Sequence, residues 1–211
     1  MPGPAHQTEA HVLARAPHTG DHLVLTCFSP DDGLLTALLR ITRSQKPDTA
    51  PPPDLFDRLA VTLEHGRGSP AGGLWFVREH RLLMRHTGIG RDYEPLAAAS
   101  RLARLITQNP GPEDSRVAID ALLTQAFAAF SRPAARPDMV YFKSLYRLTR
   151  DEGLPLKQEW LPSLPPEDRL LVAAALQLTS DAPEAPPAAD VIRLAKRLEA
   201  YLVSHHDVRV D

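Results

Sequence analysis

The chain changes character once, at a junction between strand-like and helix-like sequence. Residues 72–84 read Gly-Gly-Leu-Trp-Phe-Val-Arg-Glu-His-Arg-Leu-Leu-Met and predict a strand, which a turn at Thr87–Gly90 connects to a helix over residues 91–106. The segments before this junction have strand-like patterns, and those after it have helix-like patterns. This order predicts an α+β chain with its strands first and its helices second.

Four further strands are predicted ahead of the junction. They are Ala10–Arg15, Leu23–Phe28, Leu34–Ile41 and Phe56–Glu64. The last is the clearest, because Leu59, Val61 and Leu63 recur at the period of two that marks a half-buried strand. Five short strands without a helix between them favour a small closed barrel, of which the OB-fold is the common five-stranded form. We therefore expect an OB-fold domain over residues 1–86.

The remainder predicts an all-helical domain over residues 87–211. Asp92 is expected to cap its first helix. The second helix has the clearest helical period, with Ile119, Leu122, Leu123, Ala126, Phe127 and Phe130 on one face. A third helix begins at Pro137 and ends at Gly153. The fourth is expected to bury Leu170, Leu171, Ala174 and Leu178, and the last to bury Val191, Leu194, Ala195, Leu198, Tyr201 and Leu202.

Composition excludes several classes of function. The chain holds 24 Lys and Arg against 26 Asp and Glu, a formal charge of −2, so it is not a strongly basic nucleic-acid binder on average. The sequence lacks a long apolar run and a secretion signal, which predicts a cytoplasmic protein with no membrane partner. It also lacks the motifs of phosphate loops, serine hydrolases and zinc peptidases, so we expect no enzyme activity.

The residue types that ligate metals predict neither a metal site nor a cofactor site. Cys27 is the single cysteine and lies in an apolar strand pattern, which indicates a buried structural thiol. The nine histidines have irregular spacings, so we expect each of them at the surface or in a capping role. His205 and His206 illustrate the second case, since they lie at the end of the last helix, beside its negative dipole end.

Basic residues of the barrel form the first candidate site. They follow the third strand, the loop after it and the fifth strand, and comprise Arg40, Arg43, Lys46, Arg78, Arg81 and Arg85. Such positions can follow a phosphate backbone while Phe28, Trp75 or Phe76 stacks on bases. Because neighbours on a strand face opposite ways, we expect one of Trp75 and Phe76 in the core. A solvated arginine face is the alternative, since residues 1–86 hold nine basic and nine acidic residues.

Basic residues of the third helix form the second candidate site. Lys143, Arg147 and Arg150 are spaced i, i+4 and i+7 and share one helix face. From Arg132 to Lys157 the chain has six basic and three acidic residues. The face is either solvated surface or a site for an acidic peptide or a phosphate backbone. An apolar groove beside it could hold a short acidic-hydrophobic tail.

The order of these segments resembles the RecO family of bacterial recombination mediators. Thr8–Gly33 resembles that family's first hairpin, and Leu74–Glu79 followed by Arg91–Ser100 resembles its passage from the last strand to the first helix. Phe142–Pro155, which ends in Gly153-Leu-Pro155, resembles its mid-domain helix and the end of that helix, and Leu198–His206 resembles its C-terminal helix. The similar segments cover most of the chain in the family's order.

The resemblance implies an OB-fold followed by a helical domain, and a non-enzymatic role in DNA repair and recombination at the nucleoid. RecO proteins bind single- and double-stranded DNA, anneal complementary strands and bind RecR. They also engage the acidic C-terminal tail of single-strand-binding protein and help load recombinase onto the coated strand. The barrel residues would then contact DNA, and Lys143, Arg147 and Arg150 would hold a protein partner.

Two segments depart from the family pattern. Many members carry a four-cysteine zinc module after the segment that matches Gly153–Pro155, whereas residues 156–162 hold no cysteine and cannot form one. The loop within Arg40–Pro53 is poorer in basic and small residues, which predicts weaker DNA binding than the family norm. The alternative function is a diverged protein-interaction module with the same fold that has lost DNA binding.

Overall fold

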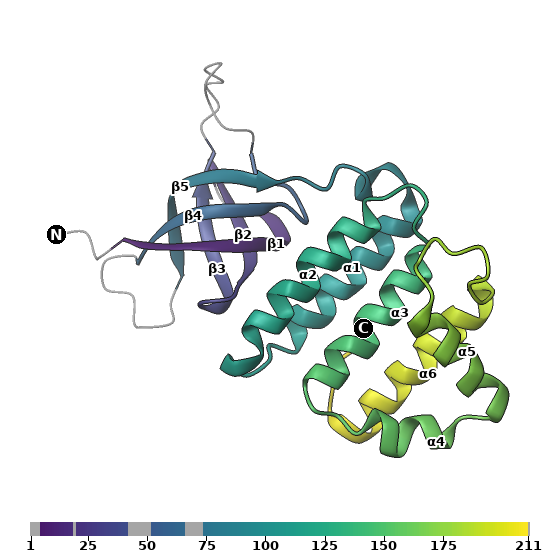
Figure 1. The fold of residues 1–211 in the computed structure, drawn as a ribbon. Helices are drawn as coiled ribbons and strands as arrows, with labels where there is room; N and C mark the ends of the chain where they lie inside the picture. Colours follow the sequence, from purple (N-terminus) through teal and green to yellow (C-terminus); the bar gives the residue numbers. More distant parts are fainter. Residues whose placement is uncertain (1–4, 19, 42–51, 66–73, 211) are drawn as a thin grey trace. The chain divides into compact units, whose positions relative to one another are not determined.

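The computed structural model describes residues 5–18, 20–41, 52–65 and 74–210 (Figure 1). The chain forms two compact units. Met1–Arg85 and Pro112–Asp120 make up the first, which we call the barrel unit. His86–Gly111 and Ala121–Asp211 make up the second, which we call the helical unit.

Five strands of the barrel unit close into a barrel in the order β1-β2-β3-β5-β4. They are β1 (His6–His18), β2 (His22–Ser29), β3 (Gly33–Arg40), β4 (Arg58–His65) and β5 (Trp75–Met84). Neighbouring strands are antiparallel except β3 and β5, which run parallel. This topology fits the OB-fold and, with the helices that follow, confirms the predicted α+β fold class.

The interior of the barrel follows the predicted alternation. Leu59, Val61 and Leu63 of β4 are buried, and they pack against the inward residues of the other strands. These include Ala10, Val12, Leu25, Cys27, Leu35, Ala37 and Leu39. Burial raises the pKa of the Cys27 thiol to about 12, so this side chain stays protonated and serves as a small apolar residue, as predicted.

Trp75 and Phe76 lie on opposite faces of β5, as the alternation predicts. Trp75 packs against the core, and its ring stacks on His65 with 3.6 Å between centroids. Phe76 is 41% exposed on the outer face. Thr62 pairs with Glu79 and Leu63 pairs with Val77, so Arg78 is the extra residue of a β-bulge. The bulge leaves both Arg78 and Glu79 exposed.

His11 and His86 are both buried, which corrects the expectation that every histidine is exposed or capping. His11 is fully buried, and its Nε2 lies 3.3 Å from Oδ1 of Asp120, in the Pro112–Asp120 segment of the same unit. Burial alone would raise the pKa of Asp120, but the hydrogen bond with His11 and the charge of Arg58 lower it below its ordinary value. The sequence did not reveal this partner because it lies more than a hundred residues away.

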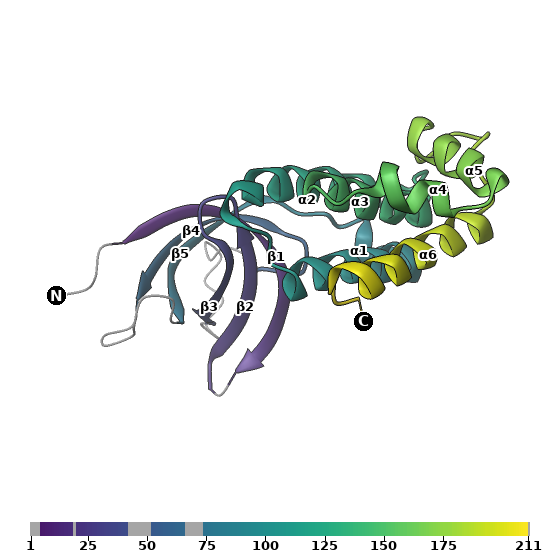
Figure 2. The same cartoon turned by 90° about the horizontal axis from the view of Figure 1, so that it is seen from below.

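Six helices follow the barrel. They are α1 (Tyr93–Gln108), α2 (Arg116–Phe130), α3 (Pro137–Asp151), α4 (Leu161–Ser163), α5 (Pro166–Gln177) and α6 (Ala188–His206). Helix α3 contacts both α1 and α6, which lie together on one side of it in Figure 2. A π-helical turn at Leu156–Trp160 precedes α4 and buries both of its terminal residues. None of the helices in the described ranges is apolar over enough length to cross a membrane.

The predicted face of α2 is confirmed, because all six of its residues are buried. The predicted face of α5 is wrong. Leu170 is 73% exposed, whereas Asp168, Val172 and Ala175 are buried. The helix is rotated this way because the Asp168 carboxylate accepts hydrogen bonds from two arginines of α6, a pairing that apolar periodicity does not register.

The start of α1 differs from the prediction in one detail. Asp92 occupies the N-cap position with an extended backbone, but its side chain makes no capping hydrogen bond. The third helical residue is Pro95, which lacks the N–H group that an N-cap side chain normally accepts from. The preceding turn is fixed instead by Gly88, whose N–H donates to Ser131 Oγ at 3.2 Å. A Cβ atom on Gly88 would lie 2.0 Å from the Ser131 carbonyl oxygen, so only glycine fits there.

Candidate functional site

The outer surface of β2, β3 and β5 brings together basic and apolar side chains. Since Ala37 and Leu39 point into the core, Leu38 and Arg40 point outward. Strand register places Leu38 between Val24 of β2 and Phe76 of β5. Arg40 pairs with His22 in the next outward-facing row. We call this surface the barrel face, and it comprises His22, Val24, Leu38, Arg40, Phe76 and Arg78.

Two predicted DNA-binding residues, Arg40 and Arg78, fall in the same row of the barrel face. Leu39 pairs with Val77 across the parallel strands, so Arg40 and Arg78 follow one step further along. Arg40 is exposed at the end of β3. Arg78 is also exposed and forms an ion pair with Glu64. An exposed ion pair of this kind contributes little in water, so a phosphate group can replace Glu64 as its partner.

Among the described residues, the predicted DNA contacts Arg81 and Arg85 do not lie on the barrel face. Arg43 and Lys46 lie outside the described residues. Arg81 is on the outer surface of β5. It pairs with Ala60 of β4, which in turn pairs with Glu9 of β1, and Glu79 lines the same shallow depression. Its surroundings are therefore acidic, in contrast to those of Arg40.

Arg85 is held by a buried carboxylate. Its Nε lies 3.0 Å from Oδ1 of Asp57 and its Nη2 lies 2.6 Å from Oδ2, while Asp57 itself is fully buried. Hydrogen bonds to Asp57 raise the pKa of Arg85 above its ordinary value. The Arg85 side chain also donates to the carbonyl of Pro52 at 2.9 Å. We assign it to the stability of the barrel unit and leave it out of the barrel face.

The basic residues predicted on α3 line a pocket of about 460 Å³ in the helical unit. Lys143, Arg147 and Arg150 are joined there by Arg132, which follows α2. Apolar groups line the same pocket, among them Leu122, Ala126, Ala129, Val140 and Leu176. None of the described residues that line it is acidic. We call this site the basic pocket.

Each cation of the basic pocket has a partial partner that orients it. Lys143 donates to the carbonyl of Leu178, and its partial burial lowers its pKa below the ordinary value. Arg147 and Arg150 both contact Asp151, through Nε at 3.4 Å and Nη2 at 2.7 Å respectively. One carboxylate thus positions two guanidinium groups whose combined charge exceeds its own, so the pocket keeps a positive potential.

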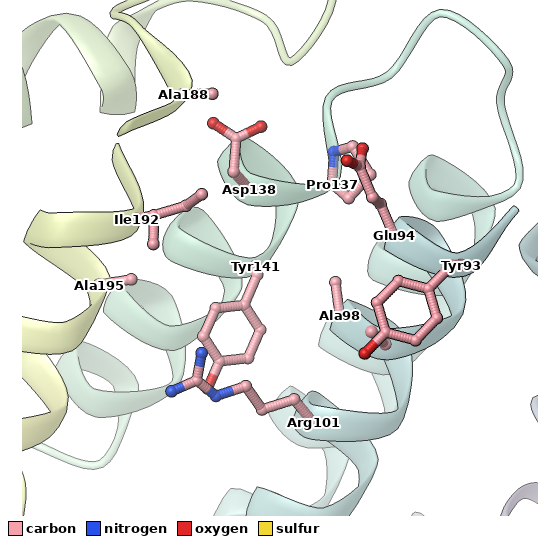
Figure 3. Close-up of a pocket in the computed structure, with 11 residues that line it drawn as sticks. Tyr93, Glu94, Ala98, Arg101, Pro137, Asp138, Tyr141, Ala188, Ile192 and Ala195 are labelled. Atoms are coloured by element: carbon pink, nitrogen blue, oxygen red, sulfur yellow. The ribbon is translucent and has the colours of Figure 1, made fainter. Parts of the chain in front are cut away.

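A further cavity, of about 330 Å³, contains none of the residues predicted to bind DNA or a partner (Figure 3). It lies between α1, α3 and α6, and much of its lining is alanine. At one end, Arg101 lies over the Tyr141 ring at 5.0 Å and donates to Glu199 at 2.5 Å. Tyr141 Oη donates to the same carboxylate at 2.6 Å, and burial followed by this bond raises the pKa of Tyr141 well above its ordinary range. This network satisfies a buried carboxylate and was missed because its members come from three distant helices.

A polar cluster at the end of the barrel contains serine, histidine and aspartate, but not in a catalytic order. Ser29 Oγ lies 2.6 Å from Thr8 Oγ1 and 3.4 Å from Asp32, whereas His6 Nε2 contacts Asp32 at 2.8 Å. Activation of a serine needs a hydrogen bond between its hydroxyl and the base, and the contacts of Ser29 go elsewhere. Within the described ranges, no three His, Cys, Asp or Glu side chains gather as metal ligands would.

No known family model matches the chain, and no curated protein is significantly similar to it. Function is therefore inferred from the barrel face and the basic pocket.

Proposed function

We propose that this protein is a non-enzymatic DNA repair and recombination mediator of RecO type. In this role it binds DNA on the barrel face, promotes annealing and helps load recombinase onto strands coated by single-strand-binding protein. The basic pocket holds the acidic C-terminal tail of that protein, and RecR is a further partner. The observation that carries the proposal is the basic pocket, where four cations surround an apolar lining with no acidic residue among the described ones.

The chemistry of the basic pocket suits a short tail that is both acidic and apolar. Guanidinium groups bind carboxylates through paired N–H donors, and Asp151 orients both Arg147 and Arg150 in the lining of the pocket. The apolar lining next to them can bury a hydrophobic residue of the same tail. A purely anionic ligand would leave that lining in water, so a mixed tail gains more than a phosphate does.

The barrel face supports the DNA-binding part of the proposal. In OB-fold proteins the outer surface of the second and third strands binds oligonucleotides and oligosaccharides. Here that surface carries Arg40 and extends onto Arg78 of β5. Backbone phosphates bind such arginines without regard to base sequence.

The second candidate function is a protein-interaction module without DNA binding. It is favoured by the commitment of Arg85 to Asp57 and by the acidic surroundings of Arg81. These two features remove two of the six predicted DNA contacts. The two functions differ in whether the basic pocket and the barrel face both bind their ligands.

Binding of a labelled single strand to the wild-type protein is expected to weaken steeply as salt rises. Each phosphate that an arginine neutralises contributes about −0.7 to the slope of log affinity against log salt for single strands. Changing Arg40 and Arg78 together to alanine should therefore reduce the slope by about 1.4. Fluorescence anisotropy at several salt concentrations measures this change.

Arg81→Ala is the matched control for that titration, since Arg81 is an exposed arginine of the same strand in acidic surroundings. It should leave the slope nearly unchanged. A flat salt response, or the absence of binding at low salt, contradicts the DNA-binding role. If the acidic tail is still captured in that case, the protein-interaction module is the better description.

Charge reversal in the basic pocket is expected to abolish tail capture. Arg147→Glu combined with Arg150→Glu replaces two attractive contacts by repulsive ones. We expect the affinity for the tail to fall by about a hundredfold, which corresponds to about 2.7 kcal/mol. The measurement is the affinity for a labelled peptide with the sequence of the tail of single-strand-binding protein.

Lys196→Glu provides the control, because Lys196 is an exposed cation of α6 outside the basic pocket. It changes the net charge in the same direction and should leave peptide affinity within about twofold. Equal losses in the pocket variant and the control would indicate a general charge effect. Unchanged affinity in the pocket variant would move the tail site elsewhere.

A further inference from the structure

We infer that Phe76 is the stacking platform for an unpaired base, so that the barrel face selects single-stranded over double-stranded DNA. The inference rests on the proposed function and adds the strand state of the ligand and the side chain that recognises it. It starts from a partly exposed aromatic ring that lies between Leu38 of β3 and Glu64 of β4, next to the row that holds Arg40 and Arg78.

Phe76 points away from the barrel interior, which other residues fill. It is 41% exposed, whereas its neighbour Leu38 is 8% exposed on the same outer surface. Strand register sets Phe76 beside Leu38, and Leu38 beside Val24 of β2. One edge of the ring is therefore supported by an apolar row, and part of its surface remains in water.

The two rows that flank Phe76 differ in charge, since one is basic and the other is uncharged. On one side lie His22, Arg40 and the exposed Arg78. On the other side Thr26 pairs with Thr36, and Leu74 precedes β5. Alternate residues of a strand are about 7 Å apart. Long arginine side chains of the first row can therefore reach the phosphate of a nucleotide whose base lies on the Phe76 ring.

This arrangement discriminates between single and double strands. In a duplex each base is stacked between its neighbours and presents only its edges in the grooves. A single strand offers the face of its bases, which stack on aromatic side chains with little regard to sequence. Phosphate contacts alone do not discriminate, because both forms present a charged backbone. Phe76 therefore contributes what Arg40 and Arg78 cannot.

The test uses the whole protein and three labelled probes. One is a deoxythymidine oligomer, the second an abasic oligomer of equal length and charge, and the third a hairpin duplex. Phe76→Ala should weaken binding of the deoxythymidine oligomer by about tenfold or more, as expected for one stacked base. Its affinities for the abasic oligomer and the duplex should stay within about twofold of wild type. The slope against salt should not change, since no phosphate contact is lost.

Two further variants keep the test sharp. Phe76→Trp retains an aromatic face and should restore binding of the deoxythymidine oligomer, which a merely structural role for the ring would not require. Leu74→Ala removes a partly exposed apolar side chain of the adjacent row and should have little effect.

The outcomes separate this inference from the proposed function. If wild-type protein binds the deoxythymidine and abasic oligomers equally and Phe76→Ala changes neither, the stacking role is wrong while DNA binding stands. Equal weakening of all three probes by Phe76→Ala, without rescue by Phe76→Trp, assigns the ring to the structure of the barrel and also overturns the inference. If wild-type protein binds none of the probes, the DNA-binding role and the stacking role fail together.

Discussion

Replacing Arg85 by methionine is expected to lower the free energy of unfolding of the barrel unit by about 3–5 kcal/mol. The substitution keeps much of the side-chain volume and removes the guanidinium that neutralises Asp57. Asp57 is fully buried, and apart from Arg85 its carboxylate accepts from the backbone N–H of Asp54 at 2.8 Å. An uncompensated buried charge is far more costly than the loss of a solvated pair.

Hydrogen exchange of β4 and β5 peptides in the full-length protein measures this loss, since it reports the barrel unit separately from the helices. Arg81→Met is the matched control, because Arg81 is an exposed arginine of the same strand and should cost under about 0.5 kcal/mol. A loss below about 1 kcal/mol for Arg85→Met would show that water or another cation reaches Asp57. Arg85 would then return to the set of residues available for DNA.

Changing Asp168 to asparagine is expected to destabilise the helical unit by about 1–3 kcal/mol near neutral pH, with no difference from wild type in strong acid. Arg193 donates to both oxygens of Asp168, at 2.8 and 2.9 Å, and Arg197 donates to one of them. The hydrogen bonds from Arg193 lower the pKa of Asp168 below its ordinary value of 3.8. Both arginines are partly exposed, so solvent screening keeps the expected effect moderate.

The direction of the pH dependence follows from that lowered pKa. The contribution of ionised Asp168 is complete above pH 3.8 and is lost as the pH falls through the lower pKa of the folded state. Thermal unfolding of both proteins near neutral pH and at about pH 2 tests this expectation. Asp190→Asn is the control, since Asp190 is a more exposed acid that contacts Arg193 alone in the described structure. A difference that does not change with pH would assign the effect of Asp168→Asn to packing.

The parts of the fold that local sequence predicts are those whose partners are all apolar. The alternation of Leu59, Val61 and Leu63 and the helical period that ends at Phe130 depend only on which side of an element meets the core. Helix α5 fails that test because a charged residue, Asp168, begins its buried face. His11 fails for the same reason, since a buried polar residue is placed by a partner that is distant in sequence.

The residues of the candidate site also differ in whether their partners are local or distant in sequence. The spacing of Lys143, Arg147 and Arg150 is local, so sequence alone grouped residues that the structure finds lining one pocket. The pairing of Arg85 with Asp57 is not local, and nothing in the sequence around Arg85 distinguishes it from an exposed arginine. For Phe76 the alternation predicted that one of two aromatic residues faces outward. The register of β5 against β4 was needed to decide which of the two it is.

The parallel seam between β3 and β5 has a consequence for how a ligand would leave the barrel face. Within the described strands this seam pairs only Ala37–Leu39 with Trp75–Val77, so it is the shortest ladder of the barrel. A DNA strand bound to Arg40 on one side and Phe76 on the other would act as a cross-link over it. Breathing of the barrel and dissociation of DNA would then be coupled events, and saturating DNA would raise the melting temperature of the barrel unit.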